Sequence, residues 1–246
     1  MREETGARRA FLRTASIVGT GLILSRWVGG ERTAAGKEQN SKQEAGEEVS
    51  PVEDLMREHG VLRRALLVYT AAAATLRGAP STVAPAALQK TATLFRTFGE
   101  DYHEKKLEET YIFPAVKQAG GPVASLPDIL VEQHQRGREI TDYILAMTAG
   151  AKFGASNAEP LAKVLEAFVL MYRHHAARED TLVFPAWKRT LSAKQRDEMG
   201  EKFEEIEHQQ FGEDGYKHAV KQIGDIEGSL GLADLAQFTP PPPPHV

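Results

Sequence analysis

The sequence contains no cysteine among its 246 residues, and this absence removes several classes of site. A disulfide-stapled scaffold, a thiolate-bound zinc, a cysteine-held iron–sulfur cluster and a cysteine nucleophile are all excluded. The chain also lacks an apolar run of about eighteen residues, so no stable membrane span is expected. The formal net charge of -4 provides no excess of basic residues, which argues against nucleic acid as a partner.

Residues 1–35 are typical of a targeting segment rather than of a folded domain. Arg8 and Arg9 precede Phe11 and Leu12, and a short, weakly apolar stretch follows them. This arrangement resembles a bacterial twin-arginine export signal, although an ordinary basic tail is the alternative. The resemblance implies recognition by the twin-arginine export machinery and a periplasmic or otherwise exported protein. Residues 36–49 are charged and polar, which predicts a flexible linker.

Helix signals fill the chain from residue 50 to about residue 230, and strand signals are lacking. Ser50 to Glu53 form a capping box with a proline at the first helical position. Apolar residues then recur at three- and four-residue steps, which indicates one apolar face on each helix. Four long helices are expected, at about residues 50–76, 85–118, 125–149 and 157–190.

Long amphipathic helices with short connections predict an all-α fold, an up-down-up-down four-helix bundle over residues 50–190. A second capping box, from Ser192 to Gln195, opens a helical extension expected over residues 191–230. Residues 231–246 form a proline-rich tail.

The bundle sequence repeats itself weakly. His59 and His134 are 75 residues apart, and His103 and His175 are 72 residues apart. Each half contains a histidine, a long gap, a second histidine, a glutamate and then Phe-Pro. Independent surface histidines would rarely fall into this pattern, so the repeat points to a shared site.

A buried metal centre explains these residues better than separate core positions do. A lone histidine on an apolar helix face, such as His59 or His134, is more often a satisfied core residue. His175 and Glu179, however, are one helical turn apart on an apolar face and could bind one metal. Burying four imidazoles and two carboxylates without partners would cost several kcal/mol each. Six such ligands suit two ions of iron, manganese or zinc that share bridging carboxylates.

The order of these residues resembles the hemerythrin-like (HHE cation-binding) family. The match is carried by residues 102–105 (Tyr-His-Glu-Lys), 108–114 (Glu-Glu-Thr-Tyr-Ile-Phe-Pro) and 179–185 (Glu-Asp-Thr-Leu-Val-Phe-Pro). The resemblance covers about residues 50–190 and implies a non-haem di-iron centre that binds dioxygen or related small molecules. The metal ligands that it implies are His59, His103, Glu108, His134, His175 and Glu179. Glu108 and Glu179 would be the bridging carboxylates.

One departure from the family pattern concerns the second helix. The family places glutamate four residues after histidine, but Glu108 follows His103 by five. On a regular helix this spacing turns the two side chains about 140° apart. A π-turn between His103 and Phe113 would bring them back together, and we predict one there. If the helix is regular, Glu104 or Glu109 becomes the candidate substitute.

A second departure concerns the third helix, where dioxygen carriers of the family have another histidine one turn after the first. That position is Arg138 here, which leaves one iron with more open coordination and weakens the expectation of reversible oxygen transport. Gly137 could leave space beside the metals for a diatomic ligand, or could serve helix packing. His174 is the alternative ligand if the helix register is off by one, and His208 is a further candidate histidine.

The sequence therefore favours an exported di-iron protein that binds dioxygen or another small diatomic ligand, for sensing, carriage or scavenging. A di-iron redox enzyme acting on peroxide or nitric oxide is the alternative, as are a metal-holding protein and a bundle with vestigial ligands. Whether the protein is an enzyme stays open at this point.

Overall fold

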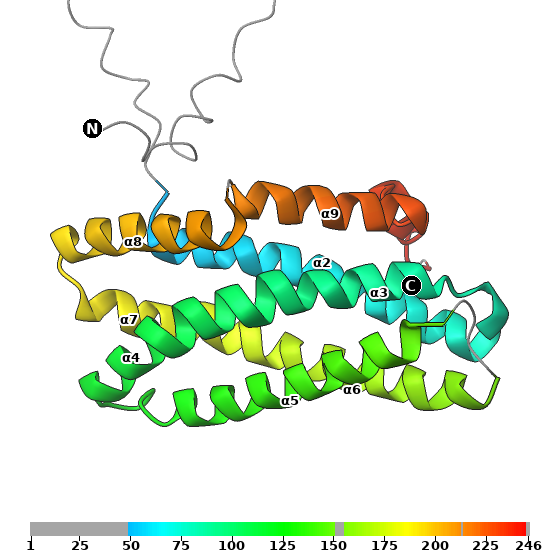
Figure 1. Cartoon of the computed structure of the whole chain (residues 1–246), viewed down its shortest axis with the longest axis horizontal. Helices are drawn as coiled ribbons and strands as arrows, with labels where there is room; N and C mark the ends of the chain where they lie inside the picture. Colours follow the sequence, from blue (N-terminus) through cyan, green and yellow to red (C-terminus); the bar gives the residue numbers. More distant parts are fainter. Residues whose placement is uncertain (1–48, 151–154, 213, 245–246) are drawn as a thin grey trace, which may run out of the picture. The chain divides into compact units, whose positions relative to one another are not determined.

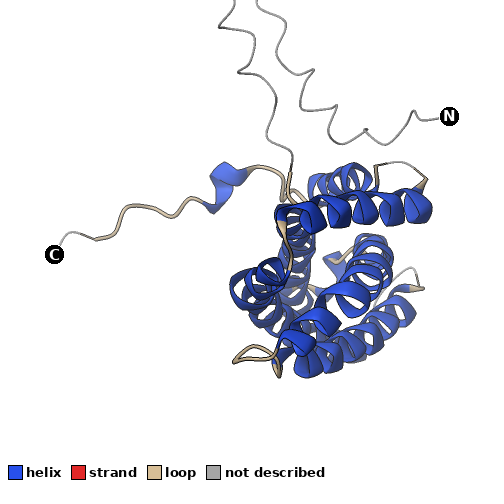
Figure 2. Ribbon diagram, turned by 90° about the vertical axis from the view of Figure 1, so that its left-hand side faces the viewer, coloured by secondary structure: helices blue, strands red, loops and turns tan. Residues whose placement is uncertain are grey.

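The computed structural model describes residues 49–150, 155–212 and 214–244, and every regular element in these ranges is helical (Figures 1 and 2). The α-helices are α2 (Pro51–Gly78), α3 (Pro85–Leu94), α4 (Phe113–Ala119), α5 (Leu126–Thr148), α6 (Ala155–Arg178), α7 (Phe184–Thr190), α8 (Ala193–Phe211) and α9 (Gly215–Ser229). Short 3-10 helices lie at η1 (Pro80–Thr82) and η4 (Leu235–Phe238). The expected all-α class is confirmed for the described residues, whereas the expected export signal and nearly all of the linker lie outside them.

Two segments have π-helical hydrogen bonding, η2 (Phe95–Ile112) and η3 (Glu179–Val183). η2 follows α3 and precedes α4 without a break, because the residues at both junctions keep right-handed helical dihedral angles. α3, η2 and α4 therefore form one continuous helix. α6, η3 and α7 do the same in the second half of the bundle. These two long helices correspond to the ones expected near residues 85–118 and 157–190.

The predicted capping boxes lie at helix starts, where they satisfy backbone groups that have no partner within the helix. The Glu53 amide donates to the Ser50 hydroxyl at 3.3 Å, and Pro51 takes the first turn of α2. At α8 the capping box is complete, since the Gln195 side chain also accepts from the Ser192 amide at 2.8 Å. Gly212 ends α8 with a φ of 77°, a left-handed conformation that glycine adopts without strain.

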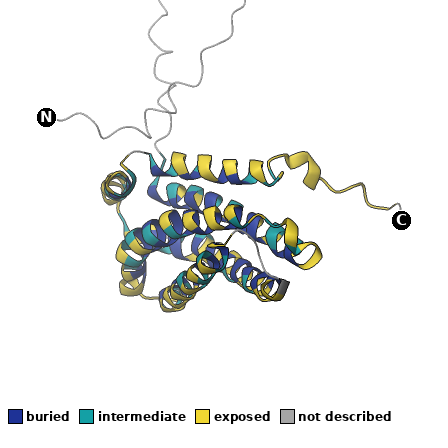
Figure 3. Cartoon of the chain, turned by 45° about the vertical axis from the view of Figure 1, so that its right-hand side comes forward, coloured by how far each residue is buried: buried dark blue, intermediate teal, exposed yellow. Residues whose placement is uncertain are grey.

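The long helices pack lengthwise, with α2 against α6, α3 and η2 against α5, and α4 against α7 (Figure 1). Their buried faces turn toward one another and their exposed faces turn outward (Figure 3). An aromatic cluster fills one part of this core, in which the Phe95 ring contacts Phe168 and Tyr172 edge-on, at centroid distances of 4.9 and 4.8 Å. None of the helices in the described part of the chain is both long and apolar enough to span a bilayer.

The C-terminal helices cover one side of the bundle. α8 packs on α2 and η2, and the Trp187 ring stacks on Phe203 at 5.7 Å. α9 packs on α2 and α3, where Arg64 forms a two-pronged ion pair with Glu227. The extension is therefore part of the same core rather than a loose appendage.

Candidate metal centre

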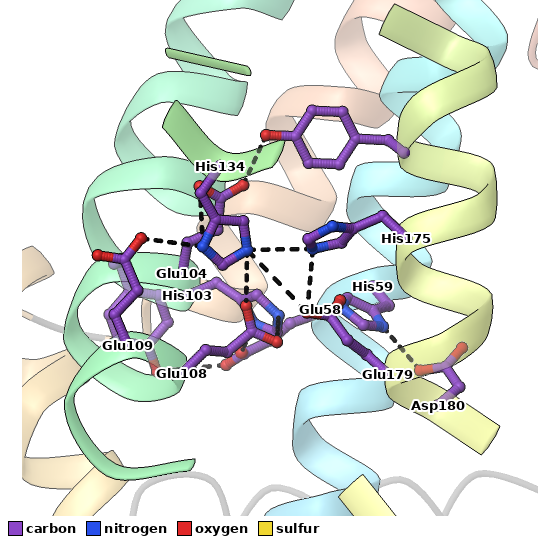
Figure 4. Close-up of polar contacts among 12 residues, drawn as sticks. Glu58, His59, His103, Glu104, Glu108, Glu109, His134, His175, Glu179 and Asp180 are labelled. Atoms are coloured by element: carbon purple, nitrogen blue, oxygen red, sulfur yellow. Dashed lines mark hydrogen bonds and ion pairs between the residues drawn. The ribbon is translucent and has the colours of Figure 1, made fainter. Parts of the chain in front are cut away.

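Six buried polar side chains meet between the long helices, and Figure 4 shows them pointing toward one region. Each is at most 3% exposed. They are His59 from α2, His103 and Glu108 from η2, His134 from α5, His175 from α6 and Glu179 from η3. These are the six residues that the sequence singled out, and they lie together in the fold.

Each of the two carboxylates lies between histidines of different helices. Glu108 places Oε1 at 3.3 Å from His103 Nε2 and Oε2 at 3.4 Å from His134 Nε2. Glu179 places Oε1 at 3.0 Å from His175 Nε2 and Oε2 at 3.5 Å from His59 Nε2. Each carboxylate therefore lies close to one histidine of each imidazole pair.

The four imidazoles form two pairs. The Nε2 atoms of His134 and His175 are 3.0 Å apart, and the rings of His59 and His103 have centroids 4.7 Å apart. Ligand atoms of Glu108, Glu179 and the His134/His175 pair lie within 4.8 Å of one another, as do those of Glu108 and the His59/His103 pair. The cluster therefore contains two groups of potential ligands that share Glu108, and each could hold a metal ion. We name them by their histidines, the 59/103 position and the 134/175 position.

The π-helical geometry of η2 brings His103 and Glu108 onto one side. Hydrogen bonds span five residues, as from the Phe113 amide to the Glu108 carbonyl, so a five-residue spacing comes close to one full turn. The predicted π-turn is confirmed, and it extends further toward the N-terminus than expected. Glu104 and Glu109 are not needed as substitutes for Glu108.

The second π segment, η3, was not expected, because His175 and Glu179 already have a regular four-residue spacing. The repeated Phe-Pro dipeptide is the signal that could have predicted it. Pro114 and Pro185 each lack an N–H and so leave a helical carbonyl without its usual donor. Each proline lies two residues after the end of a π segment, with a phenylalanine between them. The Phe184 amide bonds to the Glu179 carbonyl as the Phe113 amide bonds to the Glu108 carbonyl.

The donor atoms of the cluster fit a metal ion. His103 Nε2 and both carboxylate oxygens of Glu108 and Glu179 are buried and have no hydrogen-bond partner among the described residues. Carboxylate oxygens that are buried in this way are costly unless a cation satisfies them. Imidazole nitrogen and carboxylate oxygen together are a donor set suited to iron, manganese or zinc.

The carboxylates around His103 and His134 raise the pKa values of these histidines by more than burial lowers them. Burial favours the neutral forms, but the facing carboxylates raise the pKa of His103 well above its usual value and that of His134 to about 10. The same histidines hold the pKa of Glu108 well below its usual range against the effect of burial. Glu108 is thus held ionised, while His103 and His134 must each give up a proton when they bind a metal.

Every histidine of the cluster turns its second nitrogen, Nδ1, to an acceptor outside the cluster. These bonds join His59 to Asp180 at 2.7 Å, His103 to Glu58 at 2.7 Å, His134 to Glu109 at 2.9 Å and His175 to Gln133 at 2.9 Å. We call Glu58, Glu109, Gln133 and Asp180 the outer acceptors. Sequence reasoning assigned none of them this place, although each is next in sequence to a predicted ligand.

Arg138 pairs with two glutamates that are not among the six cluster residues. Its guanidinium lies 2.5 Å from Glu109 Oε1 and 3.4 Å from Glu104 Oε2. The Tyr172 hydroxyl occupies the space that a β-carbon at Gly137 would need. This hydroxyl donates a hydrogen bond to Glu104 Oε1 at 2.8 Å. Helix packing, rather than room for a ligand, explains the glycine.

A cavity of about 10 Å³ adjoins the cluster. Its wall combines apolar side chains with members of the cluster, including His59, Leu62, Leu66, Phe95, Tyr172 and His175. This volume is about the room that one water molecule needs.

The two remaining candidate histidines lie outside the cluster. His174 is exposed, with its Nδ1 atom 3.3 Å from the Arg178 guanidinium, although it is the immediate neighbour of buried His175. His208 is exposed on α8.

Comparison with known proteins agrees with this geometry. Residues 50–187 match the family described as the hemerythrin HHE cation binding domain. Uncharacterized proteins from Mycobacterium bovis and from two strains of Mycobacterium tuberculosis are 47% identical over 193 residues, which is 78% of this chain and 74% of theirs. No solved structure matches the chain significantly. Both the family match and the buried His/Glu cluster indicate a metal-binding protein, and the chain belongs to the hemerythrin HHE cation-binding domain family.

Proposed function

We propose that this chain is an exported non-haem di-iron protein that binds dioxygen or another small diatomic ligand, for sensing, carriage or scavenging. The observation that carries the proposal is the convergence of four imidazoles and two carboxylates at one buried place. Within it, His103 Nε2 and the carboxylate oxygens of Glu108 and Glu179 lack hydrogen-bond partners among the described residues. Two cations would satisfy these atoms together.

The six ligand residues divide into two groups. His59 and His103 would hold one iron, and His134 and His175 the other, with Glu108 and Glu179 shared between them. Iron in such a site supplies reversible electron transfer and open positions for small ligands. The protein contributes a buried set of donors, and manganese and zinc suit the same atoms.

The size of the cavity supports a small ligand. A volume of about 10 Å³ beside His59 and His175 is the room for a molecule about the size of water, and it is too small for an organic substrate. Leu62, Leu66 and Phe95 make part of its wall apolar, which suits an uncharged diatomic molecule.

A second candidate function is redox chemistry on peroxide or nitric oxide. It is favoured by the hydrogen-bonded pair of Tyr172 and Glu104, both of which line the same cavity. Unlike Glu108 and Glu179, Glu104 is not one of the proposed metal ligands, and reversible oxygen binding does not need such an additional carboxylate beside the metals. A protein that only holds metal is the remaining alternative.

We also propose that residues 1–35 direct export through the twin-arginine machinery, and that the bundle has up-down-up-down order. The short connections between α2, the continuous helix from α3 to α4, α5 and the continuous helix from α6 to α7 support this order. Fractionation of the host tests the export proposal. Replacing Arg8 and Arg9 by lysine should retain the protein in the cytoplasm, and unchanged export would contradict the assignment.

Metal analysis of protein purified from its own host tests the central proposal. We expect two irons per chain and a visible absorption that changes reversibly with oxygen. His175→Ala should lose iron, whereas the neighbouring exposed His174→Ala should retain it. Turnover of peroxide or nitric oxide that disappears in His175→Ala would favour the enzyme instead, and metal-free protein of equal stability would refute both.

A further inference from the structure

We infer that the four outer acceptors are positioning residues for the metal centre, and that Gln133, the one neutral member, makes the 134/175 position the weaker of the two metal positions. This inference rests on the proposed di-metal site. It adds that the 59/103 position binds metal more tightly than the 134/175 position.

The outer acceptors link the helices in a closed circuit. Glu58 on α2 accepts from His103 on η2, and Glu109 on η2 accepts from His134 on α5. Gln133 on α5 accepts from His175 on α6, and Asp180 on η3 accepts from His59 on α2. Each helix therefore orients a histidine of the next helix.

This circuit determines which nitrogen carries the proton in three of the four imidazoles. A carboxylate can only accept a hydrogen bond, so Nδ1 of His59, His103 and His134 must carry the proton and donate it. Nε2 is then left free to face the metal, as the distances from Nε2 to Glu108 and Glu179 require. An acceptor behind a metal-binding histidine also makes that histidine a stronger ligand.

The acceptors are not equal at the two positions. Both histidines of the 59/103 position donate to carboxylates, Asp180 and Glu58, at 2.7 Å. At the 134/175 position, His134 donates to Glu109 at 2.9 Å and His175 donates to the Gln133 amide oxygen, also at 2.9 Å. A hydrogen bond to an ionised acceptor is shorter and stronger than one to a neutral acceptor.

The surroundings of Glu109 and Glu58 add to this difference. Glu109 shares its Oε1 atom between His134 and the Arg138 guanidinium, and its side chain is 22% exposed. Glu58 is 1% exposed, and the Tyr102 hydroxyl donates to its other oxygen, Oε1, at 3.2 Å. The carboxylate support is therefore strongest behind His103, and the 134/175 position should bind metal less tightly.

The test is an anaerobic titration with ferrous iron against a competing chelator, which resolves the two binding steps without any assay of activity. We expect a tight step and a weak step in the wild-type chain. His59→Ala should remove the tight step, and His175→Ala should remove the weak one. The reverse assignment would overturn the inference.

Single changes at the outer acceptors then test their role. Gln133→Glu should tighten the weak step about 10-fold, and Asp180→Asn should weaken the tight step about 10- to 100-fold. Exposed residues provide controls with the same change in charge, Gln135→Glu on α5 and Asp197→Asn on α8. Neither control should move either step.

The outcomes separate this inference from the proposed function. If no variant binds two irons, and the wild-type chain does not either, the proposed di-iron site itself is wrong. If the wild-type chain binds two irons with equal affinity, or if Gln133→Glu and Asp180→Asn behave like their controls, the site stands and the inference about the outer acceptors fails.

Discussion

The Tyr172 hydroxyl lies where a β-carbon of residue 137 would project, so a glycine at position 137 is a steric condition for the Tyr172–Glu104 hydrogen bond. The three residues come from α5, α6 and η2, and the contact therefore fixes how closely these helices approach beside the metal cluster.

Gly137→Ala should displace the Tyr172 ring and leave buried Glu104 without its hydroxyl donor. We expect a loss of about 2 kcal/mol or more in the free energy of unfolding, because overpacking and a broken buried hydrogen bond each cost about 1–3 kcal/mol. Denaturant unfolding measures it. Gly228→Ala in α9, where a β-carbon meets no atom within 4 Å, is the control and should be neutral or stabilising. Equal behaviour of the two variants would contradict the steric role.

Removal of metal should destabilise the protein. Two ions bound only by the folded chain stabilise it by about 2.7 kcal/mol for each site at a free metal concentration 100 times the dissociation constant. Thermal unfolding with and without a chelator measures this difference. Glu179→Gln, which removes a shared carboxylate, should abolish most of the chelator effect, whereas exposed Glu198→Gln should preserve it. An effect of the same size in Glu179→Gln would argue against a bridging role.

Glu100 should make the metal-free protein less stable as the pH rises. Burial raises the pKa of this carboxyl from 4.5 to about 7, although the Thr141 hydroxyl, which donates at 2.5 Å, acts in the opposite direction. The folded chain therefore holds the proton more tightly than the unfolded chain. Its contribution to stability is complete below about pH 4.5 and is lost as the pH rises through about 7.

Glu100→Gln removes this titration. Relative to the wild-type chain, the variant should gain about 3 kcal/mol in unfolding free energy between pH 4.5 and pH 8. Urea unfolding at several pH values, with chelator present throughout, measures the difference. Exposed Glu201→Gln should follow the wild-type curve. Parallel curves for Glu100→Gln and the wild-type chain would show that Glu100 titrates normally.

The ion pair between Arg64 and Glu227 should anchor α9 to α2. Arg64 Nε lies 3.0 Å from Glu227 Oε1, and the pair is partly buried. Its interaction energy should therefore exceed that of a typical solvent-exposed ion pair. A double-mutant cycle with alanine should give a coupling energy of about 1 kcal/mol or more. The exposed Lys221–Asp225 pair on α9 serves as the comparison and should give at most about 0.5 kcal/mol. Equal coupling energies for the two pairs would show that the Arg64–Glu227 pair contributes no more than an exposed ion pair.

The sequence by itself determined the helical class, the helix starts and the residues that face the core. Its three- and four-residue periodicity shows which side chains share a helix face, so His59, His134 and His175 could be assigned inward. The five-residue step from His103 to Glu108 even required a departure from regular helix, and η2 provides it.

Only the tertiary structure decided which groups meet across helices. Periodicity describes the angle of a side chain around its own helix, and it says nothing about which neighbouring helix that angle faces. The pairing of His134 with His175, the acceptors behind the four histidines and the filling of the space at Gly137 by Tyr172 therefore had to come from the packed bundle. These contacts depend on the distance and rotation between helices, which the packing of the whole core sets.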